Sequence, residues 1–266
     1  FHRQRVAAYG ATMVEHTART RARWSDHSTL DLDQEMMRLT LSIAGKTLFD
    51  ADVESEATEI GAALTTMMQG WPKLLSPLYP ILSKLPLPSN RILREAQQRL
   101  DDTVLRMIAE RRASGEDRGD LLSMLLMAQD EEDGSGMSDK QVRDEAMTLF
   151  IAGHETTANA LTWTWYLLAQ HPAVEAKLHD ELDTVLGDRL PHADDVARLP
   201  YTRKVFTEAI RLYPPAWTIG RRALNDYDVA QYRIPANSMI FMSPYVTQHD
   251  SRYFPNPEAF DPERWT

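Results

Sequence analysis

Residues 151–158, which read IAGHETTA, place a glycine, an acid and two threonines in a stretch without proline. Threonine inside a helix can donate a hydrogen bond to the carbonyl four residues earlier, so we expect Thr156 to bond to Ala152 and Thr157 to Gly153. Such bonds bend a helix, and the small residues Ala152 and Gly153 let a flat or bulky group approach the backbone. The segment predicts either a binding groove on a helix or a plain glycine kink with a polar face.

His154 and Glu155 also begin the H-E-x-x-H pattern, in which two histidines on one helix face bind zinc. The second histidine position holds Ala158, so the two-histidine grip is missing and a zinc protease is not indicated. We therefore expect His154 to be an ordinary histidine on the helix surface.

A second group of charged residues begins with Glu208 and Arg211, three positions apart and thus on one helix face. Such a pair alone is usually a surface ion pair of small value. Here Pro214-Pro215 end the helix, extended chain follows, and Arg264 in FDPERW could bring a second guanidinium to Glu208. A buried carboxylate shared by two arginines is costly to break, which predicts a structural clamp rather than a catalytic group.

The elements that must position these residues are mostly helices. Ser138 and Gln141 form a capping box, and no proline follows until His171-Pro172, which allows a helix of about 33 residues and roughly 50 Å. The other helices that we expect cover residues 1–24, a segment capped by Asp31 or Asp33, 54–69, a segment from Ser89 or Asn90 to 113, 120–130, 172–186 and 201–212. Five prolines make residues 71–90 a packed connection rather than a helix.

Beyond residue 216 the pattern turns extended, in YDVAQYRIP and SMIFMSPYV, and predicts the strands of a small sheet. Many helices followed by short strands give an α-rich α+β fold with a long central helix and small β-sheets. We expect residues 1–266 to belong to a single domain, since that length can bury a sizeable core.

The composition excludes several classes of function. A formal net charge of -10 argues against a nucleic-acid partner. The chain has no cysteine, which excludes disulfides, zinc–cysteine sites and thiol nucleophiles within it. No apolar run reaches the length of a membrane span. Phe1 and Thr266 give both ends the look of cuts, so we expect a piece of a longer protein.

Taken together, the three motifs resemble the cytochrome P450 family. The family's central-helix pattern of a small residue, glycine, any residue, an acid and threonine matches residues 152–156. Its Glu-x-x-Arg motif matches Glu208 and Arg211, followed by an aromatic-Pro-Pro ending. Its Pro-Glu-Arg-aromatic motif matches residues 262–265. Each motif alone is weak or moderate, but their order and spacing also fit the family, over the whole chain.

The resemblance implies roles for single positions. Glu155 and Thr156 would support proton delivery to dioxygen at a haem iron. Ala152 and Gly153 would line the oxygen groove over the haem. The further roles are a clamp that braces the haem-binding loop (Glu208, Arg211, Arg264), a haem propionate contact (Arg221, with Arg222 as the alternative), and contact with the substrate (Leu149, Thr218, Ile219, residues 62–69 and the proline-rich connection).

The resemblance also implies cofactors and partners. A haem-thiolate monooxygenase of this family uses haem b with its iron, dioxygen, and electrons from NAD(P)H delivered by a ferredoxin or a flavoprotein reductase. The expected substrate is a hydrophobic small molecule such as a fatty acid, a terpene or a drug-like compound. The segment AGHETTANAL favours a soluble, cytoplasmic protein of bacterial type.

Three departures from the family pattern leave alternatives open. The family's axial cysteine follows the Pro-Glu-Arg motif, and this chain holds no cysteine. The family's upstream helix with Trp and Arg haem contacts is not present before Phe1, and residues 248–250 read QHD where many members have His-Arg-Asp. A non-catalytic member of the same fold is the first alternative. A helical scaffold with coincidental motifs is the second, and it predicts an exposed Glu208.

Overall fold

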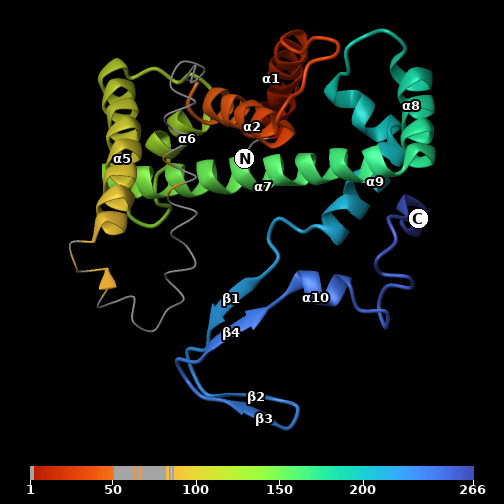
Figure 1. The fold of residues 1–266 in the computed structure, drawn as a ribbon. Coiled ribbons are helices and arrows are strands. Elements are labelled where there is room, and N and C mark those ends of the chain that lie inside the picture. The colour runs from red at the N-terminus through yellow and green to blue at the C-terminus, as the bar shows by residue number, and fades with distance from the viewer. Residues whose placement is uncertain (1–2, 51–62, 64–65, 67–81, 84, 86) are drawn as a thin grey trace. The chain divides into compact units, whose positions relative to one another are not determined.

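The computed structural model of the protein describes residues 3–50, 63, 66, 82–83, 85 and 87–266, with side chains described from residue 8 onward. The helix predicted at residues 54–69 and most of the connection at 71–90 lie outside the described residues. The chain divides into two compact units, Phe1–Ala158 and Asn159–Thr266. Figure 1 labels the helices and strands of both units.

The described part of the first unit is helical. It contains α1 (Arg3–Ala22), α2 (Leu32–Phe49), α5 (Pro88–Ser114), α6 (Leu121–Met127) and the first half of α7 (Asp139–Gln170). Apolar residues at intervals of three and four give each long helix one face to bury. The core of the unit takes side chains from all but α1: Leu41, Ala44, Phe49, Ala63, Ala96, Leu100, Val104, Ile108, Leu122, Val142, Ala146, Met147 and Phe150.

The long helix α7 is 32 residues and passes from the first unit into the second (Figure 1). Its start confirms the predicted capping box, because the Ser138 backbone N–H donates to Gln141 Oε1 at 2.9 Å and the Gln141 N–H donates to Ser138 Oγ at 3.3 Å. Its end before His171-Pro172 is also as predicted, since the residue that precedes a proline avoids helical backbone angles.

The second unit continues with α8 (Pro172–Leu186), a 3-10 turn η1 (Ala193–Arg198), α9 (Pro200–Leu212), β1 (Ile219–Arg222), β2 (Tyr227–Val229), β3 (Tyr232–Ile234), β4 (Met239–Met242), α10 (Pro244–Gln248) and η2 (Pro262–Arg264). Its core joins the end of α7 to α9 and the C-terminal segment through Leu167, Leu168, Tyr201, Val205, Ala209, Leu212 and Phe260. The α8 and α9 boundaries match the sequence prediction, because Pro172, Gly187 and Pro200 mark them.

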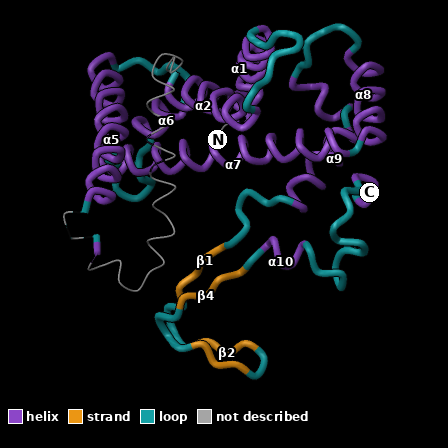
Figure 2. The backbone as a smooth tube through the Cα atoms, viewed as in Figure 1, coloured by secondary structure: helices purple, strands orange, loops and turns teal. Residues whose placement is uncertain are grey.

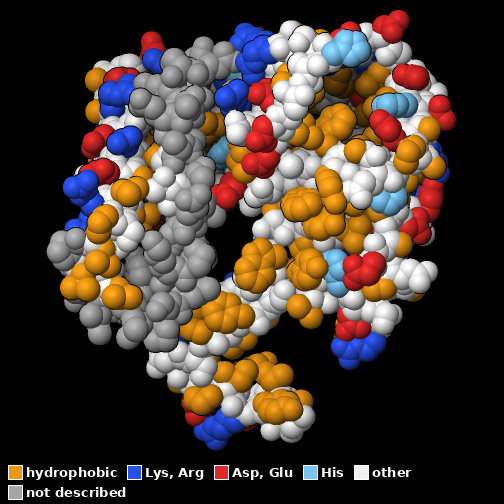
Figure 3. Space-filling model, in the orientation of Figure 1, with side chains coloured by type: hydrophobic (Ala, Val, Ile, Leu, Met, Phe, Trp, Pro, Cys, Tyr) orange, Lys and Arg blue, Asp and Glu red, His pale blue; other side chains and the backbone are white. Residues whose placement is uncertain are grey.

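The extended segments form two separate antiparallel sheets of two strands each, β1–β4 and β2–β3 (Figure 2). The first pairs Ile219 with Met242 and Arg221 with Ile240. Hydrophobic side chains gather on the visible surface of these strands (Figure 3). The exposed ones are Ile219, Tyr227, Val229, Tyr232, Met239, Phe241 and Met242. The prediction of short strands is confirmed, and the residues on β1 have apolar neighbours.

Other helix boundaries differ from the prediction. Asp31 caps α2 as expected, accepting from the Gln34 N–H at 3.3 Å. The predicted cap of α5 at Ser89 or Asn90 is wrong, because Pro88 already occupies the first turn and the cap residue Leu87 makes no side-chain cap bond. Proline is favoured there since its ring sets a helical φ and the missing N–H would have no partner. The helix expected at 120–130 is the shorter α6.

No helix in the portion of the chain that the structure describes combines the length and the apolar character required to cross a bilayer.

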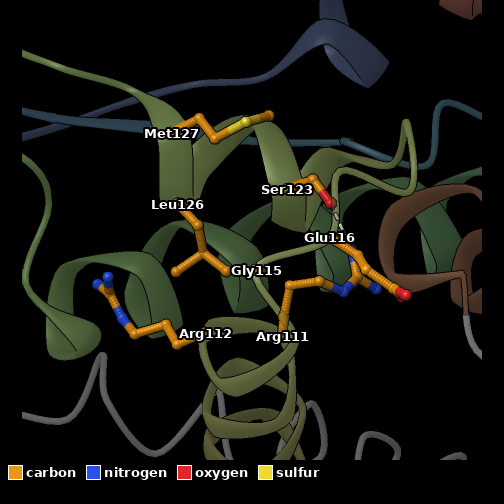
Figure 4. Close-up of a pocket in the computed structure, with 7 residues that line it drawn as sticks. All are labelled: Arg111, Arg112, Gly115, Glu116, Ser123, Leu126 and Met127. Carbon is orange, nitrogen blue, oxygen red and sulfur yellow. Dashed lines mark hydrogen bonds between the residues drawn. The ribbon is translucent and has the colours of Figure 1, made fainter.

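A buried arginine ties three elements of the first unit together. Arg111 of α5 donates to Asp120 Oδ1 at 2.7 Å, to Ser123 Oγ and to the Phe49 carbonyl at 3.2 Å. Burial alone would raise the pKa of Asp120, but the hydrogen bonds from Arg111 and Ser123 outweigh it and hold that pKa below its usual value. Figure 4 shows Arg111 and Ser123 at the wall of a pocket of about 320 Å³.

Replacing Asp120 should therefore destabilise the protein strongly. Asp120→Ala leaves the Arg111 guanidinium buried without its carboxylate, and we expect a loss of about 3–5 kcal/mol in the free energy of unfolding. The matched control is Asp139→Ala, which breaks the neighbouring but exposed Arg112–Asp139 pair and should cost at most about 1 kcal/mol. Chemical denaturation measures both, and equal losses would contradict the assignment.

Candidate active site

One face of α7 in the first unit is exposed and made largely of small residues. Ala152, Gly153 and Thr156 are exposed, and Leu149 is half-buried. Positions three and four apart lie on the same side of a helix, so these residues form one surface. Apart from its own helix, no atom of the described residues lies within 4 Å of a Cβ atom added at Gly153. The backbone at this turn is therefore accessible to a flat group.

Thr156 makes the predicted bond to its own helix. Its Oγ1 donates to the Ala152 carbonyl at 2.6 Å, as Thr148 Oγ1 does to the Asp144 carbonyl at 2.7 Å two turns earlier. The corresponding bond from Thr157 is not found within the described parts of the chain. The Thr156 hydroxyl donates its one hydrogen to a carbonyl. Its oxygen can therefore still accept a hydrogen bond from a donor on the exposed side of the helix.

Glu155 differs from an ordinary surface carboxyl. It is half-buried, and its pKa is raised, first by that burial and second by the negative charge of Asp33 on α2. A carboxyl with a raised pKa keeps its proton to a higher pH, so it can give and take protons closer to neutrality.

His154 is buried, and the prediction that it lies on the helix surface is wrong. Only 4% of it is exposed, and its Nδ1 lies 2.9 Å from Thr40 Oγ1 of α2. Burial lowers the pKa of its imidazole to about 4. The helical repeat places residue 154 on the same face as the core residues Phe150 and Ala158, which is why it points inward.

In the second unit, Glu208 and Arg211 form a completely buried ion pair. Arg211 Nε donates to Glu208 Oε2 at 2.9 Å, and Nη2 donates to Oε1 at 2.8 Å. The remaining guanidinium hydrogens are taken by the carbonyls of Gln248 and Pro257 at 2.8 Å and of Ala259 at 3.1 Å. All five N–H groups that an arginine can offer therefore have acceptors.

The structure also brings Arg264 to the same carboxylate. Its Nε lies 3.3 Å from Glu208 Oε1, and its Nη1 donates to the Pro255 carbonyl at 2.7 Å. Two further donors, the Asp261 N–H at 3.1 Å and Trp265 Nε1 at 2.9 Å, complete the set. The sequence analysis did not predict a role for Trp265. The available signal was its place in the PERW motif, because a buried indole N–H needs a hydrogen-bond partner.

These contacts favour the ionised form of the Glu208 carboxylate. Burial alone would raise the pKa of Glu208, but hydrogen bonds from Arg211, the Asp261 backbone and Trp265 outweigh it, so the pKa lies below its usual value. Glu208 is 0% exposed, which contradicts the helical-scaffold alternative, because that alternative requires an exposed carboxylate.

The β1 residues occupy a separate part of the second unit. Thr218 Oγ1 lies 3.5 Å from the Met242 carbonyl, and Ile219 is partly exposed beside Met242. Arg221 is exposed and donates to the neighbouring Gly220 carbonyl at 2.9 Å. Among residues with described positions, no carboxylate pairs with Arg221 or Arg222. Arg221 is thus a cation available to an external anion.

No group of three or more metal-ligating side chains occurs within the described ranges, and the sequence supplies no cysteine. The first unit thus holds one group of candidate residues, an exposed helix face with an acid and a hydroxyl. The second unit holds another group: an exposed arginine for which the described residues offer no carboxylate, and a clamp whose Arg211 donors all have acceptors.

Comparison with known proteins identifies the class. The family model for cytochrome P450 matches residues 2–266, so the chain belongs to the cytochrome P450 family, whose cofactor is haem. The solved haem domain of cytochrome P450DA shares the fold with a TM-score of 0.84 and 29% identity, covering 98% of this chain and 58% of that one.

Curated relatives agree with the family assignment. Cyclooctatin synthase of Streptomyces melanosporofaciens is 42% identical over 267 residues, and cyclooctat-9-en-7-ol 5-monooxygenase of the same organism is 41% identical over 268 residues. Each alignment covers 100% of this chain and 58% of the relative. The chain thus spans a little over half the length of the relatives that it matches.

The clamp leads to a prediction about stability. Glu208→Gln removes the charge that balances Arg211 and turns part of a pure acceptor into a donor, so the free energy of unfolding should fall by about 3–5 kcal/mol. Glu263→Gln is the matched control, because Glu263 is exposed and pairs with Lys177 and Lys204 on the surface. That change should cost at most about 1 kcal/mol in chemical denaturation.

The pH dependence provides the second measurement. Because the folded-state pKa of Glu208 is lowered, its contribution is fully present above the usual pKa of glutamate and is lost as pH falls through the lowered value. The difference in stability between the native protein and Glu208→Gln should therefore shrink with acidification. A difference that is small at neutral pH, or independent of pH, would refute the ionised clamp.

Proposed function

We propose that the protein is a haem-thiolate monooxygenase that inserts one oxygen atom from dioxygen into a hydrophobic organic substrate. Residues 1–266 would form part of its single catalytic domain. The observation that carries the proposal is the turn of α7 at residues 152–156, where an exposed small-residue surface adjoins a carboxyl of raised pKa and a hydroxyl. Family membership and relatives named as oxygen-inserting enzymes support it.

Each of the two units holds residues that suit a haem. Ala152 and Gly153 offer a flat, accessible stretch of helix, and Arg221 offers an exposed guanidinium suited to a propionate. Arg222 is the alternative for that contact. When bound through a cysteine thiolate, haem activates dioxygen for insertion into a substrate, and the thiolate would come from a cysteine outside the 266 residues.

Glu155 and Thr156 are proposed to deliver protons at this surface. The Thr156 hydroxyl is oriented by the Ala152 carbonyl, so it can accept a hydrogen bond from water on the open side. The raised pKa of Glu155 lets this carboxyl hold its proton to a higher pH than an ordinary glutamate does. The two neighbours thus supply an oriented acceptor and a reservoir of protons on one helical turn.

The Glu208–Arg211–Arg264 clamp is proposed to brace the haem-binding loop without touching reactants. Its five donors to one carboxylate fix the segment from Asp261 to Trp265 against α9. The role would be positional, because a fully buried and saturated ion pair has no free donor or acceptor for chemistry.

The substrate class and the electron source complete the proposal. Leu149, Thr218 and Ile219 would contact a mainly hydrocarbon substrate such as a terpene. One relative is named for cyclooctat-9-en-7-ol, an unsaturated alcohol by its name. Electrons would come from NAD(P)H through a ferredoxin or a flavoprotein reductase.

Thr156→Ala tests proton delivery in the complete, haem-loaded enzyme. We expect product formed per dioxygen consumed to fall by about tenfold or more, with hydrogen peroxide rising instead, because the oriented hydroxyl is lost. Thr156→Ser keeps the hydroxyl and should retain most of the yield. The matched control is Thr148→Ala, which removes the same type of back-bond from the same helix and should leave the yield unchanged. Equal effects of the two alanine variants would argue against a role for Thr156.

The 266-residue chain by itself tests the source of the thiolate. Because it contains no cysteine, we expect no thiolate-type carbonyl spectrum after reduction and addition of carbon monoxide in the presence of haem. A histidine- or water-ligated spectrum, or no binding, agrees with this expectation. A clear thiolate-type spectrum from the isolated chain would contradict it.

A further inference from the structure

One polar residue interrupts the buried face of α7. The face contains five residues at intervals of four, each at most 4% exposed: Val142, Ala146, Phe150, His154 and Ala158. The helical repeat calls for an apolar residue at 154. A histidine buried there costs free energy unless its ring nitrogens are hydrogen-bonded.

Thr40 of α2 meets this requirement, and its other contacts indicate the direction of the bond. Thr40 Oγ1 lies 2.9 Å from the Met36 carbonyl, 3.3 Å from the Met37 carbonyl and 2.9 Å from His154 Nδ1. A hydroxyl has one hydrogen, and the carbonyls can only accept. A hydroxyl that donates within its own helix accepts from His154, which requires the Nδ1–H tautomer of the ring.

The residues around His154 hold its ring in place and keep it neutral. The His154 ring stacks against Phe150 with centroids 6.4 Å apart, and Phe150 packs edge-on against Phe49 of α2. Burial lowers the pKa of His154 to about 4, so the ring is neutral over the ordinary pH range and carries a single N–H. The contact between α2 and α7 thus includes one directional hydrogen bond to a neutral imidazole ring.

We propose that the Thr40–His154 hydrogen bond is a positioning device that sets the rotation of α7 about its axis, and thereby the aim of Glu155 and Thr156. The inference rests on the proposed monooxygenase function. Apolar packing alone is non-directional, whereas a hydrogen bond weakens steeply when its angle changes. His154 is adjacent to Glu155 and two residues before Thr156, so it anchors the same turn from behind.

The magnitudes favour this role. Side chains reach roughly 5 Å from a helix axis, so a rotation of about 20° would move a surface atom by roughly 2 Å. A misplacement of about 1 Å can reduce a catalytic rate by about a hundredfold. A rotation of about 10°, which moves such an atom by roughly 1 Å, is thus already large for proton delivery.

The same helix supplies a second pair that serves as a matched control. Ser42 Oγ donates to the Leu39 carbonyl at 2.9 Å and lies 3.0 Å from Nδ1 of the buried His16 on α1. This pair has the same chemistry and burial as Thr40–His154, but it joins α2 to α1 rather than to α7. Its removal should loosen the unit without rotating the turn at residues 152–156.

The test compares Thr40→Val, Thr40→Ser and Ser42→Ala in the complete, haem-loaded enzyme. Thr40→Val should lower Tm by about 2–6 °C and lower product per dioxygen by about threefold or more, whereas Thr40→Ser should retain both. Ser42→Ala should lower Tm similarly but keep the product yield. If Ser42→Ala reduces the yield as much as Thr40→Val, the effect is general loosening and the proposal is overturned.

The double variant Thr40→Val/His154→Leu distinguishes an effect on stability from an effect on the orientation of Glu155 and Thr156. Replacing both partners of a buried hydrogen bond by apolar groups is nearly neutral for stability, so Tm should recover relative to Thr40→Val. The product yield should stay low, because the directional contact is still missing. Recovery of the native yield together with Tm would show that packing is sufficient and would overturn the proposal.

Two measurements do not depend on turnover. Nitrogen NMR should show the Nδ1–H tautomer of His154, which changes in Thr40→Val. Amide hydrogen exchange over residues 152–157 should accelerate in Thr40→Val and not in Ser42→Ala. An Nε2–H tautomer, or unchanged exchange in Thr40→Val, would overturn the proposal. If the native enzyme instead yields no oxygenated product while these two results hold, the proposed function fails and the anchor stands.

Discussion

The carboxylate of Glu208 imposes the strictest constraint in the structure. A charge with no exposure to water is tolerated only when donors surround it, and those donors must come from specific places in the chain. Here they come from α9 itself, from the Asp261 backbone and from the side chains of Arg264 and Trp265. Arg211 in turn requires carbonyls between residues 248 and 259. One buried charge thus dictates the path of the last twenty residues around α9.

The turn of α7 at residues 152–156 follows the opposite arrangement. Its exposed side carries groups whose hydrogen-bonding capacity is left partly unused, as at Thr156, and whose proton affinity is shifted, as at Glu155. Its buried side carries His154, whose Nδ1 is bonded to Thr40. In the proposed mechanism, the groups that react remain accessible, while the groups that position them are hydrogen-bonded. In both places the buried polar groups are hydrogen-bonded. In the clamp these bonds fix a chain segment, and in the helix turn they leave the exposed polar groups accessible.

Local signals account for what the sequence could predict. The capping box at Ser138, the proline after His171 and the stop at Gly187 act within a few residues, so the boundaries of α7 and α8 followed from them. The burial of His154 depends on Thr40, which is 114 positions away, and no local pattern specifies that contact. Arg264 could be placed at Glu208 from 56 positions away because its charge implies a carboxylate partner, whereas the indole N–H of Trp265, 57 positions away, implies no particular acceptor and was missed.

The same distinction explains why proton delivery could be inferred but the substrate only by class. Hydrogen bonds and charges have direction and fixed partners, so residues such as Glu155 and Glu208 imply particular neighbours and particular chemistry. Apolar contacts have neither, and Leu149 and Ile219 accept any hydrocarbon surface of suitable shape. Specificity among hydrophobic substrates then depends on the summed shape of many such contacts. If the proposed function holds, variants that alter substrate choice should be sought among the exposed apolar residues of the β1–β4 sheet, while the clamp and the Thr40–His154 bond are retained.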